Sequence, residues 1–184
     1  MIELARSGDL IFYKLEEAAE VGKFRIAGME DGRFSGGGFE FFRGLGIIGY
    51  ETTFKIWLRK FPRPIFIVAV RGTDVVSWVF IEEWDESALD GMGVWVLRAI
   101  ETLPPLRAKK VGYRLLLLGA QQSVGYILTK PLTPEAERFF RKAGFMSPKE
   151  FAKSPIDLTR HPGYLILTPY KKAQMLSQLP QYFS

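Results

Sequence analysis

The sequence predicts a mixed α/β fold of the α+β kind, with a central mixed and mostly antiparallel sheet flanked by helices. Three observations predict it. The chain has 184 residues, the size of one domain, so we treat residues 1–184 as a single unit. Hydrophobic residues make up 47% and charged residues 24%, which are globular values. Strand-like runs follow one another in the middle of the chain, and strands then alternate with helices, which predicts hairpins before a parallel crossover.

The composition excludes several kinds of chemistry. The chain has no Cys, no Asn and a single His, His161. A disulfide framework, a thiol nucleophile and a zinc–thiolate site are therefore ruled out, and we expect no metal. His161 precedes Pro162-Gly163 and is expected to be a loop residue.

The net charge of +5 suits an anionic ligand, such as a phosphate, CoA or a nucleic acid, without choosing among them. No apolar run approaches the ~18 residues that a membrane span needs. The first residues carry an acid and no long apolar run, unlike a signal peptide. We therefore expect a cytoplasmic protein with no membrane contact.

The first twenty residues predict a strand and a helix. Residues 1–6 have the character of a first strand. Ser7-Gly8-Asp9 offers a turn and a helix cap, and residues 10–20, rich in Leu, Glu and Ala, favour a helix.

Residues 21–50 form a loop rich in glycine and phenylalanine. Glycines weaken regular structure, whereas the aromatic residues argue against a solvated linker. The segment is either an irregular packed loop or an aromatic flap over a ligand cleft. In the second case Phe34, Phe39, Phe41 and Trp84 would line a pocket.

The middle of the chain predicts a helix followed by three strands. Residues 51–61 have helical spacing of apolar side chains, and Pro62 and Pro64 end that helix. The predicted strands are 65–70, 75–84 and 93–102, with a hairpin turn at 71–74.

The last third alternates helices and strands. A strongly apolar helix should begin near Lys110 and be followed by a strand at 124–129. Thr133 and Pro134 are a typical helix start, and that helix should end at Gly144. A final strand at 163–168 and a short helix at 171–179 complete the order.

A basic loop between strand 93–102 and the next helix is a candidate anion site. The strand ends at Thr102, and the helix start would present free N–H groups and a partial positive charge. Arg107, Lys109 and Lys110 add formal charge, and Gly112 leaves room for a ligand. An exposed basic turn without a ligand is the alternative interpretation.

Two segments resemble known motifs. Residues 104–116, PPLRAKKVGYRLL, resemble motif A of the GCN5-related N-acetyltransferases: Arg or Gln, two residues, Gly, one residue, then Gly or Ala. Residues 135–145, EAERFFRKAGF, resemble the motif B helix of the same family, which ends in Gly-Phe. The resemblance covers about residues 65–145 and implies a domain of this family, with acetyl-CoA as co-substrate.

The resemblance also implies where acetyl-CoA binds. Its pyrophosphate would lie against backbone N–H groups from Arg107 through Gly112, and its pantetheine arm would pair with the backbone near Thr102 and Leu103. The implied binding residues are Thr102, Leu103, Arg107, Ala108, Lys109, Lys110, Val111, Gly112 and Tyr113. The acetyl group would pass directly to an amine held between strands 93–102 and 124–129.

The sequence departs from the family pattern in three places. Lys110 stands where the first motif Gly belongs. Phe140 stands where the family often has the Tyr that protonates the thiolate, and Leu132-Thr133 replaces the usual Asn. Tyr126 is the substitute candidate for the acid, with a half-buried strand aromatic as its other interpretation.

Two carboxylates are candidates for the general base. By strand alternation Glu101 shares a face with Trp95, Leu97 and Ala99. Glu82 shares a face with Trp78, Phe80 and Trp84. A carboxylate at the end of an apolar face is partly desolvated, which raises its pKa towards that of a base. Each is otherwise a rim carboxylate in water, or one paired with Arg98 or Arg71.

Three functions remain open. The first is an N-acetyltransferase that acts on an amine of unknown identity. The second is a catalytically weak module that binds CoA or an acyl-CoA. The third, argued mostly from charge, is a basic nucleic-acid-associated domain. A homodimer is one assembly that the chain could form.

Overall fold

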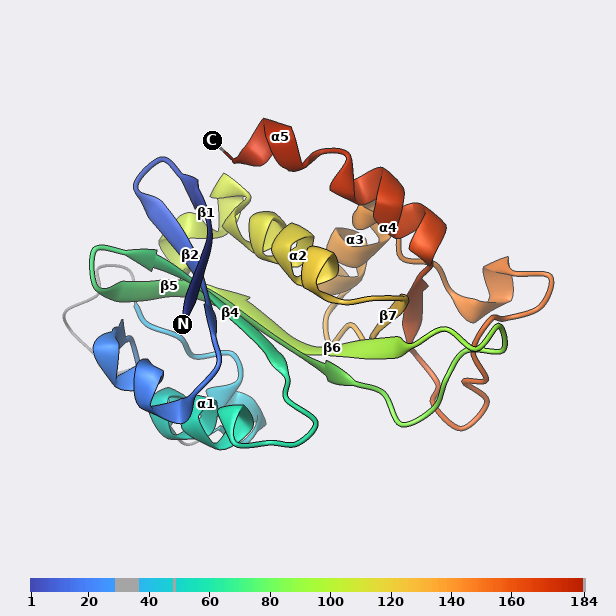
Figure 1. The fold of residues 1–184 in the computed structure, drawn as a ribbon, viewed down its shortest axis with the longest axis horizontal. Helices are drawn as coiled ribbons and strands as arrows, with labels where there is room; N and C mark the ends of the chain where they lie inside the picture. Colours follow the sequence, from blue (N-terminus) through green and yellow to red (C-terminus); the bar gives the residue numbers. More distant parts are fainter. Residues whose placement is uncertain (29–36, 48, 184) are drawn as a thin grey trace.

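The computed structural model describes residues 1–28, 37–47 and 49–183. Within these ranges a single sheet runs through the molecule in the order β1-β2-β4-β5-β6-β7-β8, and β3 lies beside β5 (Figure 1). The strands are β1 (Ile2–Ser7), β2 (Leu10–Leu15), β3 (Arg25–Ile26), β4 (Ile65–Arg71), β5 (Asp74–Glu83), β6 (Val94–Thr102), β7 (Tyr126–Thr129) and β8 (Leu165–Leu167).

The helices comprise five α-helices and four short 3-10 helices in the described residues. They are η1 (Ala18–Lys23), η2 (Arg43–Leu45), α1 (Tyr50–Leu58), η3 (Pro104–Lys109), α2 (Val111–Gln122), α3 (Pro134–Ala143), η4 (Pro148–Glu150), α4 (Pro169–Leu176) and α5 (Leu179–Tyr182). No helix in these ranges is long and apolar enough to cross a membrane.

The sheet is mixed and mostly antiparallel, as the sequence predicts. Pairing between the described strands is parallel only for β6 with β7 and for β3 with β5. Helix α2 covers one face and α1 the other (Figure 1). Phe54 and Trp57 of α1 pack on Trp78 and Phe80 of β5, and Trp57 stacks on Phe80 at 4.3 Å between ring centroids.

The predicted helix over residues 10–20 is wrong. Residues 10–15 form β2, which lies between β1 and β4. Gly8, with φ +61°, turns the chain from β1 into β2. The buried side chains of Leu10 and Phe12 alternate with half-buried ones, so strand pairing overrides the helix preference of the segment.

The other predicted elements are confirmed, with shifted ends. Thr133 starts α3 by accepting a hydrogen bond at its Oγ1 from Ala136 N (3.1 Å), and Gly144 ends it in the left-handed region. The terminal helix starts at Pro169, two residues earlier than expected, because Thr168 caps it. The short α5 has no counterpart among the predicted elements.

A β-bulge at Arg98 changes which side chains share a face of β6. Ala99 lies opposite Phe80, but Leu97 lies opposite Ile81, the next residue of β5. Arg98 is therefore the extra residue on β6. A bulge of this kind reverses the alternation of side chains beyond it.

The prediction that four side chains of β6 share one face is consequently wrong. Trp95 and Leu97 lie on the α2 side, whereas Ala99 and Glu101 lie on the α1 side. Glu82 lies opposite Val96 and keeps the face of Phe80. Glu101 and Glu82 thus share a face of the sheet, although Leu97 does not share it.

Gly119 allows α2 to lie close to β5, and its replacement should destabilise the protein. A Cβ atom at this position would lie 2.6 Å from Cδ1 of Ile81. We expect Gly119→Val to destabilise the fold by about 1–3 kcal/mol through overpacking. The measurement is urea unfolding. Val124→Ala, at an exposed position, is the control and should leave the midpoint within error. An unchanged midpoint for Gly119→Val would contradict the packing.

Candidate functional site

Strands β6 and β7 separate at the bulge and leave a free strand edge. Their parallel pairing runs from Val94 with Tyr126 to Leu97 with Thr129 and ends there. β6 continues to Thr102, paired on its other side with β5. Among the described residues no strand pairs with this edge after Leu97. Alternate residues of an antiparallel strand turn their N–H and C=O groups outward, so this edge can pair with an extended ligand.

The free edge leads directly to the N-terminus of α2. Leu103, Leu106 and Val111 are buried and anchor the connecting turn, while residues 107–110 are exposed. Within the described chain no acceptor faces the backbone N–H groups of residues 110–113. These N–H groups and the helix dipole form an anion-binding cradle.

Lys110 adopts the left-handed conformation that glycine usually takes, with φ +57° and ψ +23°. It is the single non-glycine residue with positive φ in the described chain. A side chain there costs about 1–3 kcal/mol and such residues cluster at functional sites. The Lys110 ammonium lies 5.8 Å from the ring centroid of Tyr182 in α5. Its side chain therefore extends towards α5 rather than closing the cradle.

The C-terminal segment fixes this side of the cradle. Tyr113 Oη donates to Gln178 Oε1 (2.7 Å), and the Tyr113 ring packs on Tyr182. Arg114 donates from Nη1 to Lys109 O (2.8 Å) and from Nε to Tyr182 O (3.3 Å). The basic side chains at the start of α2 are thus held by α5.

Two of the predicted binding residues, Thr102 and Leu103, already have backbone groups hydrogen-bonded within the protein. Leu103 N–H donates to Val76 O (2.9 Å), and Thr102 O accepts from Arg107 Nε (3.2 Å). A ligand can therefore pair with β6 only before Leu103. Ala108 and Lys109 lie exposed in η3, beside the cradle.

Glu101 is a buried carboxylate on the α1 face, 6% exposed. Its Oε2 accepts hydrogen bonds from the backbone N–H groups of Phe41 (3.0 Å) and Glu40 (3.2 Å). Burial raises the pKa of Glu101, although these N–H groups, the Tyr50 hydroxyl and the charge of Arg107 oppose the rise. The second oxygen, Oε1, has no hydrogen-bond partner in the described chain and is the atom that could take a proton.

Tyr50 and Trp78 surround the carboxyl with aromatic rings. Trp78 lies opposite Glu101 in the sheet, and Tyr50 packs on Trp78 at 6.1 Å between centroids. Burial and the neighbouring Glu101 raise the pKa of Tyr50, so this hydroxyl stays protonated. Its oxygen and the Trp78 Nε1 also lack partners among the described residues. Three buried polar groups without partners among the described residues thus lie among aromatic rings.

Glu82 is paired rather than free. Its carboxylate contacts Lys60 Nζ and Arg98 Nε, both at 3.1 Å. Arg98 also donates from Nη1 to Tyr164 Oη (3.3 Å) and lies over the ring of Trp84. The sequence leaves Glu82 as a general base, a rim carboxylate in water or a partner of Arg98 or Arg71, and the structure shows the ion pair with Arg98.

The remaining candidate acid lies away from Glu101. Tyr126 is opposite Val94, at the start of β6, and its hydroxyl donates to Asp90 Oδ2 (2.7 Å). Burial and Asp90 raise the pKa of Tyr126 to about 12. Phe140 is buried against Phe145 and offers no proton. By register Tyr126 shares a face of the sheet with Glu82 and Glu101, but it lies at the opposite end of β6 from Glu101.

The glycine- and phenylalanine-rich loop is packed in its described part. Phe39 is fully buried against Trp78 and Tyr50, whereas Phe41 is exposed. Phe34 lies outside the described residues. The backbone of residues 40–41 bonds Glu101, so this segment covers the candidate base.

Two residues of the site, Tyr50 and Tyr164, have no functional signal in the sequence, and Arg98 has only a weak one. A bulge leaves no local pattern, and nothing in the sequence places residue 50 or 164 near β6. For Arg98 the sequence suggests only a role as partner of a carboxylate.

Comparisons with known proteins support the same architecture. No protein-family model matches the chain, and no curated protein matches it. A mutant of the AtaT toxin bound to the C-terminus of the antitoxin AtaR matches with TM-score 0.58 and 11% identity, covering 93% of this chain and 99% of that one. The KacTA–DNA complex matches with TM-score 0.62 and 10% identity over 92% and 99%. Ard1 from Thermoplasma volcanium matches with TM-score 0.51 and 12% identity over 86% and 95%.

The chain has the GCN5-related N-acetyltransferase fold. Identities of 10–12% show the fold alone. Structures of AtaT with acetyl-CoA bound are among the matches, which shows that this fold holds that ligand in AtaT.

Proposed function

We propose that the chain is an acetyl-CoA-dependent N-acetyltransferase that transfers the acetyl group directly to an amine. One observation carries the proposal: the free edge of β6 ends at the cradle of unpaired N–H groups that starts α2. An extended arm with an anionic end group fits this continuous path. The N-acetyltransferase fold of the chain supports the same conclusion.

The backbone does most of the binding in this proposal. The N–H groups of residues 110–113 hold the pyrophosphate, and Lys110 and Arg114 supply positive charge at its side. The edge of β6 between Arg98 and Glu101 pairs with the pantetheine arm. When bound, acetyl-CoA supplies the thioester that reacts with the amine.

Glu101 is the proposed base. An ammonium must lose a proton before it attacks the thioester carbonyl, and a carboxyl with a raised pKa is suited to accept it. Its unpartnered Oε1 is the proposed accepting atom. Glu82 stays the second candidate, but its two cationic partners favour an ionised carboxylate that orients Arg98.

A CoA-binding module with little transfer activity is the second candidate function. Phe140 favours it, because a buried phenyl ring cannot protonate the departing thiolate. Tyr126 and Tyr164 are the alternative hydroxyl donors, and Tyr126 is held by Asp90. We also propose that the protein is cytoplasmic and that a second copy of the chain is a partner. Among the matched structures, AtaT is bound to an antitoxin and KacTA is bound to DNA.

Ligand stabilisation tests the proposal. Acetyl-CoA at 100 times its Kd should stabilise the fold by about 2.7 kcal/mol, seen as a higher Tm. Release of free thiol across a panel of amines then separates the two candidates. Stabilisation with thiol release supports the transferase, and stabilisation without it supports the binding module. A Tm that does not change with acetyl-CoA or CoA would overturn both.

A further inference from the structure

The excess positive charge of the chain is concentrated in one segment. Nine of the 25 Lys and Arg residues, but only four of the 20 acidic residues, lie between residues 130 and 172. That excess of five equals the net charge of the whole chain, so the rest of the sequence is neutral. The loop at Arg107 and Lys110 therefore does not account for the net charge. The segment contains α3, η4 and β8.

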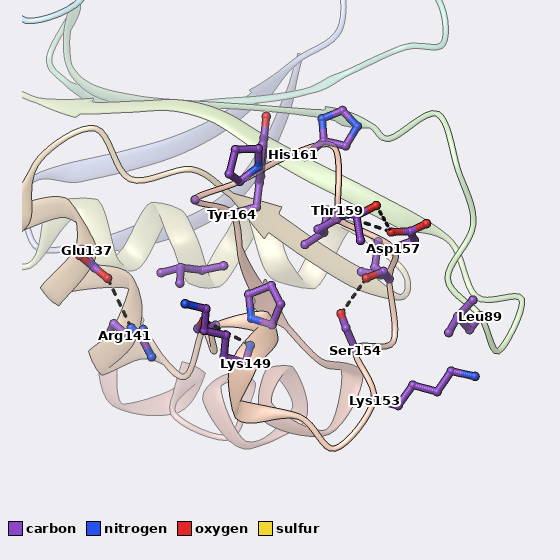
Figure 2. A pocket seen from close by; sticks show the side chains of 17 residues that line it. Leu89, Glu137, Arg141, Lys149, Lys153, Ser154, Asp157, Thr159, His161 and Tyr164 are labelled. Atoms are coloured by element: carbon purple, nitrogen blue, oxygen red, sulfur yellow. Dashed lines mark hydrogen bonds and ion pairs between the residues drawn. The ribbon is translucent and has the colours of Figure 1, made fainter.

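The same segment forms the walls of a wide depression. Its volume is about 770 Å³, within the range of roughly 300–1,000 Å³ that small-molecule sites occupy. It lies between α3 and the loop that leads to β8 (Figure 2). Apolar side chains line much of it: Leu89, Pro148, Ile156, Leu158, Pro162 and Leu165.

The acidic side chains that line the depression have partners, whereas two of its lysine side chains have none among the described residues. Glu137 pairs with Arg141 (3.7 Å), and Asp157 accepts from the backbone N–H (3.1 Å) and hydroxyl (2.8 Å) of Thr159, as Figure 2 shows. In the described part of the chain, Lys149 and Lys153 have no ion-pair partner. The two lysines therefore carry charges that no described carboxylate pairs with, whereas Glu137 is paired and Asp157, although hydrogen-bonded to Thr159, keeps its negative charge.

The depression also connects to the candidate transfer site. Tyr164 lines it, and the Tyr164 hydroxyl accepts from Arg98 at the bulge of β6 (3.3 Å). His161 lines it as well and packs on Trp84, which lies beside Arg98. A ligand in the depression would therefore extend towards the point where β6 and β7 separate.

We propose that this depression binds the acceptor through a phosphate group carried on a partly apolar body. Figure 2 shows Lys149 and Lys153 on different sides of the depression, so each can neutralise a phosphate at its own part of the rim, and the apolar floor between them receives the apolar part. The phosphate belongs either to a small phosphorylated molecule or to a nucleic-acid backbone. That the ligand is the acetyl acceptor rests on the proposed function, whereas the phosphate site itself does not.

The test measures phosphate binding with the CoA site kept occupied. AMP, inorganic phosphate and a 12-nucleotide single-stranded RNA are titrated into the protein with saturating CoA present. The variant Lys149→Glu/Lys153→Glu should weaken binding tenfold or more. The control Lys23→Glu/Arg63→Glu makes the same charge change at exposed positions on other elements and should change the affinity less than threefold. Both variants must keep the wild-type stabilisation by acetyl-CoA.

The outcomes separate the sources of the phosphate. Binding of AMP that the first variant loses supports a small phosphorylated acceptor. RNA binding that the first variant loses, without AMP binding, supports a nucleic-acid acceptor, and its affinity should then fall steeply with salt. If no probe binds, or if binding survives the first variant, the inference is overturned. If the protein does not bind acetyl-CoA, the proposed function is overturned. The same titration, repeated without CoA, would then still support or overturn the phosphate site.

Discussion

Glu101→Gln is expected to lower acetyl transfer by about 100-fold or more while raising the stability of the fold at neutral pH. General-base catalysis contributes about 10²–10⁴ in rate, and glutamine cannot accept the proton. Glutamine keeps an oxygen for the N–H groups of Glu40 and Phe41, so the loop stays anchored. Opposite effects on rate and stability at one position are typical of a residue kept for function.

The stability effect follows from the direction of the pKa shift. Burial raises the pKa of Glu101 in the folded protein above that in the unfolded chain. The contribution of this group to stability is complete below the unfolded pKa and is lost as pH rises through the folded pKa. Wild-type protein therefore carries a buried-charge cost at pH 7 that glutamine lacks. Each kcal/mol removed should raise Tm by about 2–4 °C, with the gain shrinking towards pH 4.

Glu82→Gln is the matched control for the Glu101 variant. Glu82 lies on the same face but is paired with Lys60 and Arg98, so its loss should cost less than tenfold in rate. Activity is measured as thiol release against pH, because loss of the base should also remove the acidic limb of the profile. Full activity of Glu101→Gln would make Glu101 a structural anchor of the 40–41 segment and nothing more.

Local sequence signals locate most of the fold. Proline after α1, the Thr133 cap and Gly144 fix element ends by their own backbone chemistry, so they can be interpreted without knowing the neighbours. Residues 10–15 cannot be interpreted this way. Their helix preference is local, whereas pairing with β1 and β4 depends on segments far away in the sequence.

The candidate site also has parts that local sequence signals predict and parts that depend on distant residues. The cradle is predictable because the loop, Gly112 and the helix start are contiguous in sequence. The bulge at Arg98 is not, because it is a mismatch in register between β5 and β6. Alternation indicates Glu101 as a base but gives it the wrong neighbours, since the bulge moves Leu97 to the α2 side. The contact between Lys110 and Tyr182 joins residues 72 positions apart, which no local pattern indicates.

Gly112→Glu is expected to lower the affinity for acetyl-CoA at least 100-fold while the protein stays folded. Gly112 is the second residue of α2, inside the cradle of unpaired N–H groups. A carboxylate there would occupy the place of the pyrophosphate and repel it, and it would itself interact favourably with the helix N-terminus. The fold should therefore tolerate the charge, and binding should not. Isothermal titration with CoA measures the affinity, and urea unfolding checks the fold.

Gly112→Ala separates charge from crowding at this position. A Cβ at Gly112 would lie 3.3 Å from Thr102 Oγ1, a contact that a small shift relieves. Alanine adds that contact without a charge and leaves every N–H of the cradle in place. Its effect on CoA affinity should stay below tenfold. If alanine costs as much as glutamate, the cradle is a steric wall rather than an anion site. If neither variant weakens binding, the pyrophosphate lies elsewhere, and the left-handed Lys110 loses its functional explanation.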